Sequence, residues 1–131
     1  MDQIRPNIWI GGAEGRDVVE DLKAKGITAV LNVACDINSR GDIPPEDLRQ
    51  IKIGLADHSL NQPYMKEIAV YTLKMMLLHG EIVLVHCAAG MSRSVWVVCK
   101  ALSDLEGVDP KHILEEVQAK RPVATYGPLF V

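Results

Sequence analysis

The sequence predicts an α/β fold: one domain, residues 1–131, whose central and mostly parallel sheet of about four or five strands is flanked by helices. Three observations support this fold class. The 131 residues suit one compact domain and leave no room for a second. Short β-branched and apolar runs alternate with longer amphipathic segments, which is the order of elements in parallel sheets. Residues 28–34 and 81–86 are apolar at most positions, as strands are when helices cover both faces.

The first half of the chain alternates strand-like and helix-like segments. The apolar side chains of residues 14–25 share one face, which predicts an amphipathic helix that Gly26 would cap. The polar residues 35–47, which include Pro44 and Pro45, predict a loop. The elements we expect are a strand at 7–10, a helix at 14–25, a strand at 28–34, a loop at 35–47 and a strand at 51–55.

The second half continues the alternation with two helices that begin at prolines. Pro63 suits the first turn of a helix whose apolar residues recur at helical spacing up to His79. Asp109 before Pro110 is a typical start for the last helix, which Pro122 would end. The elements we expect here are a helix at 63–79, a strand at 81–86, a helix at 95–106 and a helix at 110–121.

Charge and composition disfavour several classes of protein. Fourteen basic against seventeen acidic residues give a formal net charge of −3, which argues against general nucleic-acid binding. No apolar run approaches the ~18 residues of a membrane-spanning helix, so we expect no membrane association. The three cysteines cannot all pair within one chain, which favours the reducing cytoplasm. We therefore expect a cytoplasmic protein, and we also expect it to act as a monomer.

Residues 86–94, H-C-A-A-G-M-S-R-S, lie between a predicted buried strand and a predicted helix. Successive backbone N–H groups of a tight loop that leads into a helix form a concave anion site. A cysteine at the start of that loop, Cys87, would have a lowered thiol pKa and act as a nucleophile. Arg93 can grip two oxygens of a phosphate with its planar guanidinium group, and Gly90 permits the turn. The segment therefore predicts a nucleophilic site for a tetrahedral anion.

The pattern H-C-x-x-G-x-x-R-S after a buried strand resembles the signature of cysteine-dependent protein phosphatases, in particular their small, atypical dual-specificity branch. The resemblance extends to I-W-I-G at residues 8–11, to G-I-T-A-V-L-N-V at 26–33 and to A-K-R-P at 119–122. It implies the protein tyrosine phosphatase-like fold and a phosphocysteine intermediate. It also implies that neither a metal nor another cofactor takes part.

The resemblance assigns roles to individual residues. Cys87 would be the nucleophile and Arg93 the phosphate clamp, while Asp57, thirty residues before the cysteine, would protonate the leaving oxygen. Three other loop aspartates stay open as alternative acids: Asp36, Asp42 and Asp47. Ser94 would hydrogen-bond the sulfur and help it leave. His86 would brace the loop, unless it is an ordinary histidine at a strand end. Asn32 would tie the second predicted strand to the loop, or would simply satisfy the backbone beside that strand's end. The residues expected to bind substrate are Ala88, Ala89, Gly90, Met91, Ser92, Arg93 and Arg121.

We expect phosphorylated proteins as substrates. The chain has no room for the recognition loop of the tyrosine-specific enzymes, so a shallow cleft should admit phosphoserine and phosphothreonine as well as phosphotyrosine. Arg121 would add a second anion contact for a doubly phosphorylated or acidic peptide. Two alternatives stay open: a catalytically weak module that binds phosphoresidues, and a phosphatase for a non-protein phosphate ester.

Cys35 directly follows the predicted strand at 28–34, in V-A-C-D at residues 33–36. A similar segment occurs in a prenylated phosphatase subfamily, where its cysteine pairs with the catalytic one. The resemblance implies that Cys35 could trap an oxidised Cys87 as a disulfide. The alternative is that Cys35 only packs at the strand end.

Overall fold

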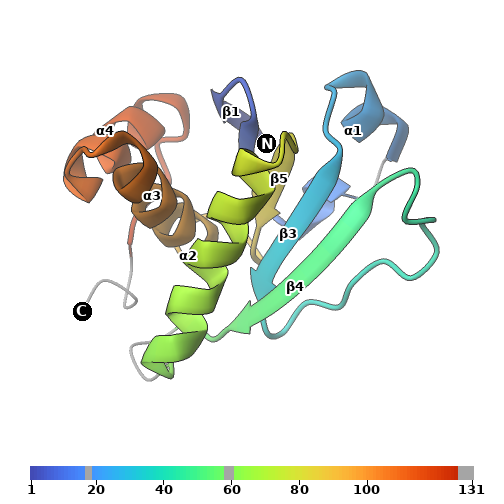
Figure 1. The fold of residues 1–131 in the computed structure, drawn as a ribbon, viewed down its shortest axis with the longest axis horizontal. Coiled ribbons are helices and arrows are strands. Elements are labelled where there is room, and N and C mark those ends of the chain that lie inside the picture. Colours follow the sequence, from blue (N-terminus) through green and yellow to red (C-terminus); the bar gives the residue numbers. More distant parts are fainter. Residues whose placement is uncertain (17–18, 58–60, 127–131) are drawn as a thin grey trace.

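In the computed structural model, a five-stranded sheet forms the centre of the molecule (Figure 1), and residues 1–16, 19–57 and 61–126 are described. The strand order is β1-β2-β5-β3-β4. β1 is antiparallel to β2, whereas β2, β5, β3 and β4 pair in parallel. The predicted fold class, a mostly parallel sheet flanked by helices, is therefore confirmed.

The N-terminal half departs from the prediction at three places. The elements are β1 (Asp2–Arg5), β2 (Ile8–Gly11), the 3₁₀ helix η1 (Ala13–Arg16), α1 (Val19–Ala24), β3 (Ala29–Ala34) and β4 (Arg49–Leu55). β1 was not predicted. β4 begins at Arg49 rather than at residue 51, and the apolar pattern missed this start because it is polar and faces solvent. The prediction of one α-helix over 14–25 is wrong at its start, and its residues 17–18 lie outside the described residues. At the start of η1, the backbone N–H of Ala13 bonds to the carbonyl of Ala88, which belongs to the loop after β5.

The C-terminal half follows the prediction closely. The elements are α2 (Pro63–Leu78), β5 (Val83–His86), α3 (Arg93–Glu106) and α4 (Pro110–Lys120). The side chain of Asp109 caps α4 by accepting a hydrogen bond from the backbone N–H of Lys111. α3 begins at Arg93 rather than at residue 95, so the last motif residues form its first turn. The motif therefore ends at a helix N-terminus.

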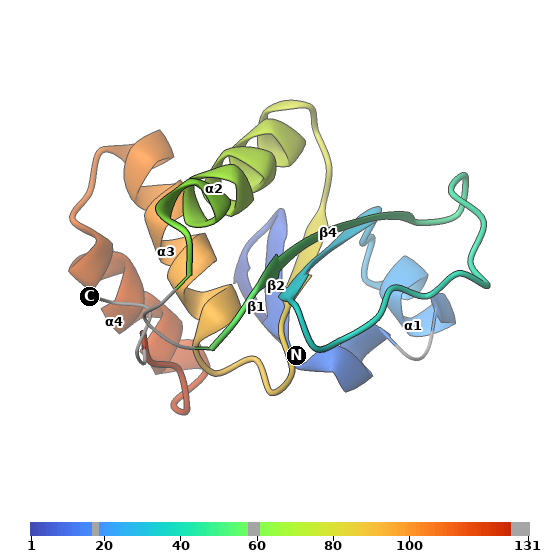
Figure 2. The same ribbon diagram turned by 90° about the horizontal axis from the view of Figure 1, so that it is seen from below.

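Helices cover both faces of the sheet. α2, α3 and α4 gather on one face and α1 lies on the other (Figures 1 and 2). Alternate residues of β3 show the consequence: Leu31 and Val33 pack in the larger core, while Val30 packs with Leu22 of α1 in the smaller one. Burial on both faces explains why β3 and β5 read as nearly continuous apolar runs.

The parallel pairing brings chemically important residues to one edge. β2, β3, β4 and β5 run in the same direction, so their carboxyl ends lie at the same edge of the sheet. The segments that follow these ends include Asp36 after β3, Asp57 after β4 and Cys87 after β5. Residues far apart in the sequence therefore meet at the start of α3.

Candidate active site

The loop of residues 87–92, here called the cysteine loop, joins β5 to α3 and lines a pocket of about 250 Å³. The residues around this pocket are Asp57, Cys87, Ala88, Ala89, Met91, Ser92, Arg93 and Thr125. Gly90 has φ +68°, and a Cβ there would lie 2.5 Å from the carbonyl oxygen of Gly11. Only glycine fits this turn, which lies close against β2.

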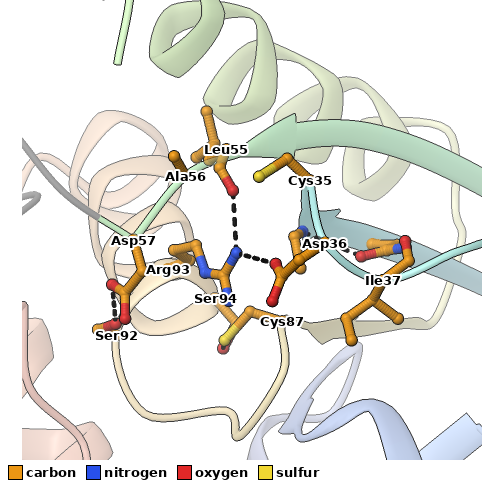
Figure 3. A network of polar contacts seen from close by, with 12 residues as sticks. Cys35, Asp36, Ile37, Leu55, Ala56, Asp57, Cys87, Ser92, Arg93 and Ser94 are labelled. Atoms are coloured by element: carbon orange, nitrogen blue, oxygen red, sulfur yellow. Dashed lines mark hydrogen bonds and ion pairs between the residues drawn. The ribbon is translucent and has the colours of Figure 1, made fainter. Parts of the chain in front are cut away.

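Cys87 is 3% exposed, and its Sγ lies 3.4 Å from Ser94 Oγ (Figure 3). Burial is the largest single influence on this thiol, and it opposes ionisation. The hydrogen bond with the Ser94 hydroxyl, hydrogen bonds with the backbone of Ser94 and Gly90, and the charge of Arg93 together outweigh burial. The net result is that the pKa of Cys87 is lowered from its ordinary value. Cys99 is the contrast, since burial raises its pKa to about 12.

Arg93 is buried beside Cys87 in the first turn of α3. Its Nη1 donates to Asp36 Oδ1 at 2.5 Å and to the carbonyl of Leu55 at 3.0 Å (Figure 3). The hydrogen bond from Arg93 holds the pKa of Asp36 below its ordinary value. Arg93 Nε is also buried, and it has no hydrogen-bond partner among the described residues. An unsatisfied buried donor of a cationic side chain is suited to binding an anion.

Asp57 lines the pocket, and its Oδ1 accepts a 2.7 Å hydrogen bond from Ser92 Oγ (Figure 3). The other three aspartates have partners elsewhere. Asp36 pairs with Arg93, Asp42 with Arg40 and Asp47 with Lys23. The hydrogen bond from Arg40 holds the pKa of Asp42 at about 2. Among the four candidate acids, Asp57 is the one in the pocket lining.

His86 is fully buried at the end of β5, and its Nδ1 lies 3.0 Å from the carbonyl oxygen of Cys87. A carbonyl only accepts, so this bond requires the proton on Nδ1. Of the two roles left open for Asn32, the structure shows the bonding to backbone at the strand end. Its side chain bonds to the carbonyl of Ile37 at 2.7 Å and the N–H of Ala34 at 3.0 Å, which stabilises the turn after its own strand rather than the cysteine loop.

Arg121, for which we expect a substrate contact, bonds to the cysteine loop and to Asp2. Its Nε and Nη2 donate to the carbonyls of Gly90 and Ala89 at 2.8 and 3.0 Å. Its Nη1 forms a 2.7 Å ion pair with Asp2 Oδ2. The guanidinium group is engaged by the outer side of the cysteine loop and is absent from the pocket lining.

The structure adds contacts that the sequence did not indicate. Thr125 lines the pocket, and its backbone N–H bonds to the carbonyl of Met91 at 2.8 Å. Ser92 was expected only to bind substrate, yet its hydroxyl holds Asp57. No signal in the sequence marked Thr125. The place of Ser92 inside the motif could have drawn attention to it.

Cys35 is exposed in the segment after β3, and its thiol is free, as are those of Cys87 and Cys99. Its proposed pairing with Cys87 stays a prediction. In the parts of the chain that the structure describes, no three His, Cys, Asp or Glu side chains gather in a way that could hold a metal ion. The described helices include none long and apolar enough to cross a membrane.

Comparison with known proteins places this site in a family. The sequence matches the catalytic domain of dual specificity phosphatases over residues 8–130. It is 26% identical to mouse dual specificity protein phosphatase 15 over 132 aligned positions, which cover 99% of this chain but 54% of that protein. Mouse dual specificity protein phosphatase 14 is 30% identical over 123 positions, covering 92% of this chain and 60% of the relative. The chain thus spans little more than half the length of these relatives.

Solved structures have the same fold. The crystal structure of human DUSP28 superposes with a TM-score of 0.85 at 22% identity, covering 99% of this chain and 90% of the other. That of DUSP15 gives 0.82 at 23% identity, with 98% and 80% covered. A match to the family over nearly the whole chain, together with a cysteine loop of the expected geometry, leads to one conclusion. The chain belongs to the family of dual specificity phosphatase catalytic domains.

Proposed function

We propose that this domain is a protein phosphatase that hydrolyses phosphotyrosine, phosphoserine and phosphothreonine monoesters through a phosphocysteine intermediate. One observation carries the proposal. The buried Cys87 thiol, whose pKa is lowered, and the buried, unsatisfied Nε of Arg93 belong to residues that line the same pocket. A nucleophile and a cation that converge on one anion-sized pocket are what attack on a phosphate monoester requires.

In the first step, the Cys87 thiolate attacks phosphorus. The S–P bond forms as the bond from phosphorus to the ester oxygen breaks, and Asp57 gives its proton to the departing oxygen. Arg93 and the N–H groups of the cysteine loop stabilise the charge on the transferring phosphoryl group. Ser92 supports this role of Asp57, because its hydroxyl holds the carboxyl group in the pocket.

In the second step, water attacks phosphorus and the S–P bond breaks. Asp57, now a carboxylate, takes the proton of the water, and inorganic phosphate is released. Cys87 leaves as a thiolate. Ser94 Oγ, 3.4 Å from the sulfur, is placed to donate a hydrogen bond to that developing charge. Neither step needs a metal ion or another cofactor.

The lining of the pocket supports a phosphorylated protein side chain as substrate. Apart from the polar groups already described, Ala88, Ala89 and Met91 line it, and Met91 is 44% exposed. An apolar rim without lysines favours a phosphorylated side chain over a polyanionic head group. Phosphotyrosine should react fastest, because its phenol, with a pKa near ~10, is a better leaving group than an alcohol.

We further infer that the domain acts as a monomer in the cytoplasm. The proposed catalytic groups Cys87, Arg93, Asp57 and Ser94 all come from one copy of the chain. The three free cysteines support a reducing compartment.

Turnover tests the proposal directly. Under reducing conditions the wild type should hydrolyse an aryl phosphate and release phosphate from phosphopeptides, and Cys87→Ser should abolish both while remaining folded. Cys35→Ser, which removes an exposed thiol outside the pocket lining, is the matched control and should retain turnover. Phosphopeptide binding without turnover by the wild type would instead identify a binding module. Turnover of non-protein phosphate esters alone would exclude phosphoproteins as substrates.

A further inference from the structure

The carbonyl groups of the cysteine loop all have donors. When successive N–H groups of a loop turn toward an anion, the carbonyl groups between them turn outward and need donors of their own. The carbonyl of Cys87 accepts from His86 Nδ1 at 3.0 Å, and that of Ala88 from the backbone N–H of Ala13 at 2.9 Å. The carbonyls of Ala89 and Gly90 accept from Arg121 Nη2 at 3.0 Å and Arg121 Nε at 2.8 Å. Those of Met91 and Ser92 accept from the backbone N–H groups of Thr125 and Trp96, both at 2.8 Å. The outer side of the loop is therefore held along its whole length.

Arg121 differs from the other donors because one side chain serves two adjacent carbonyls. It follows α4 in the chain, and it bonds the carbonyls of Ala89 and Gly90, where the backbone passes through its positive φ. A planar guanidinium group with two parallel N–H donors fixes the direction of both acceptors at once. The orientation of these two peptide groups therefore depends on Arg121.

Asp2 forms an ion pair with the remaining nitrogen of the same guanidinium group, Nη1. Its Oδ2 lies 2.7 Å from Arg121 Nη1, and the Arg121 side chain is 13% exposed. A cation buried to this degree keeps a single geometry when a carboxylate compensates its charge. Asp2 begins β1, the antiparallel edge strand, and lies before the residues that match the family.

We propose that Arg121, fixed by Asp2, is a positioning residue that holds the cysteine loop in its anion-binding conformation. The proposal rests on the proposed function only for the identity of the anion as the phosphoryl group of a substrate. Arg121 acts through the peptide groups of Ala89 and Gly90 and does not itself line the pocket. Gly90 links it to the nucleophile, since the backbone of Gly90 is among the groups that lower the pKa of Cys87.

The test compares Arg121→Met and Arg121→Lys with the wild type. Arg5→Met is the matched control, because Arg5 is also a half-buried arginine bonded to carboxylates, those of Glu106 and Glu116, but has no bond to the cysteine loop. Two readouts need no turnover: the pKa of Cys87, from the pH dependence of its alkylation by iodoacetamide, and the Kd of inorganic phosphate. The alkylated Cys87 peptide is quantified by mass spectrometry, so the other cysteines do not interfere.

We expect Arg121→Met to raise the pKa of Cys87 by about 1 and to weaken phosphate binding roughly tenfold, as the loss of two oriented hydrogen bonds implies. Arg121→Lys should recover part of both effects, because one ammonium group cannot reach both carbonyls and Asp2. Arg5→Met should lower the melting temperature without changing either readout. Asp2→Asn should shift both in the same direction as Arg121→Met, and should add nothing when Arg121 is already replaced.

Two results would overturn the proposal. One is an Arg121→Met protein whose Cys87 pKa and phosphate affinity equal those of Arg5→Met. The other is a rise in KM confined to doubly phosphorylated peptides, which would make Arg121 a substrate contact. If Arg121→Met does not fold, Arg121→Lys and Asp2→Asn decide by the same two readouts. A wild type without phosphatase turnover would refute the proposed function. The pKa of Cys87 and the Kd of inorganic phosphate would still test whether Arg121 positions the cysteine loop.

Discussion

At the scale of single residues, the proposed chemistry depends on how three side chains around the pocket are held: those of Cys87, Arg93 and Asp57. Ser94 and the loop backbone favour the Cys87 thiolate against the effect of burial. Asp36 and the carbonyl of Leu55 bond to Nη1 of Arg93, which leaves its buried Nε for an anion. Ser92 holds Asp57. Asp57 and Asp36 therefore have different partners, and we predict a different role for each.

Replacing Ser94 by alanine should move the acidic limb of kcat/KM to higher pH. The Ser94 hydroxyl stabilises the anionic form of Cys87, so its loss raises the thiol pKa and the thiolate forms later as pH increases. The pH profile with an aryl phosphate measures the shift. Ser103→Ala, on the same helix α3 but outside the pocket lining, should keep the wild-type profile. An unchanged acidic limb in Ser94→Ala would mean that this hydroxyl does not influence the nucleophile.

Asp57→Asn and Asp36→Asn should differ in how they depend on the leaving group. If Asp57 is the general acid, its loss should slow a poor leaving group by ~10²–10⁴ and an activated aryl ester far less. Asp36 pairs with Arg93, so its loss should slow all substrates by a similar factor of roughly ten or less. A series of aryl phosphates separates the two patterns. If Asp57→Asn slowed all aryl phosphates equally and Asp36→Asn slowed poor leaving groups most, Asp36 rather than Asp57 would be the general acid.

At the scale of secondary-structure elements, one carboxylate links β3, β4 and β5 at their amino ends, the edge of the sheet opposite the site. Glu81, just before β5, accepts hydrogen bonds from Arg49 Nε at 2.6 Å and from Thr28 Oγ1 at 2.5 Å. Thr28 precedes β3 and Arg49 begins β4, so one carboxylate links the starts of three parallel strands. The bond from Arg49 is the largest influence on Glu81, and the net effect is a lowered pKa.

Glu81→Gln should therefore lower the free energy of unfolding by about 1 kcal/mol at neutral pH. A carboxyl group whose pKa is lower in the folded state stabilises above its unfolded pKa, and this contribution is lost as the pH falls through the folded pKa. The difference between variant and wild type in urea denaturation should thus disappear as the pH falls below about 4. Asp104→Asn, which breaks the exposed ion pair with Lys74, should have little effect at either pH. A difference for Glu81→Gln that persists at low pH would show that the carboxylate charge is unimportant.

The secondary-structure elements also show which parts of the fold the sequence could predict and which it could not. β3, β5, α2 and α4 were predicted because both-face burial, helical spacing and proline starts are local signals. β1 was missed because Ile4 is its one buried residue in an otherwise polar edge strand. The start of the predicted helix at 14–25 was wrong because a contact with the distant Ala88, rather than local preference, decides the backbone there.

At the scale of the whole molecule, the site combines a local motif with contacts between distant segments. That Cys87 and Arg93 line one pocket could be predicted from the sequence, because one loop and the helix start that follows it hold both. The contacts of Arg121 could not, because they bring together three distant parts of the chain: Asp2, residues 89–90 and Arg121 itself. Asn32 is a different case, because its partners are local: its side chain bonds to the backbone of Ala34 and Ile37 in the turn after its own strand.

The central claim is that Cys87 carries the phosphoryl group during turnover, and mass spectrometry after rapid acid quenching tests it most directly. The Ser94→Ala variant is used because slower departure of the sulfur should let the intermediate accumulate. We expect the added mass of one phosphoryl group on the peptide that contains Cys87, present during turnover and absent once substrate is exhausted. A phosphoryl group on another residue, or turnover with no phosphorylated peptide at any time point, would contradict the phosphocysteine mechanism.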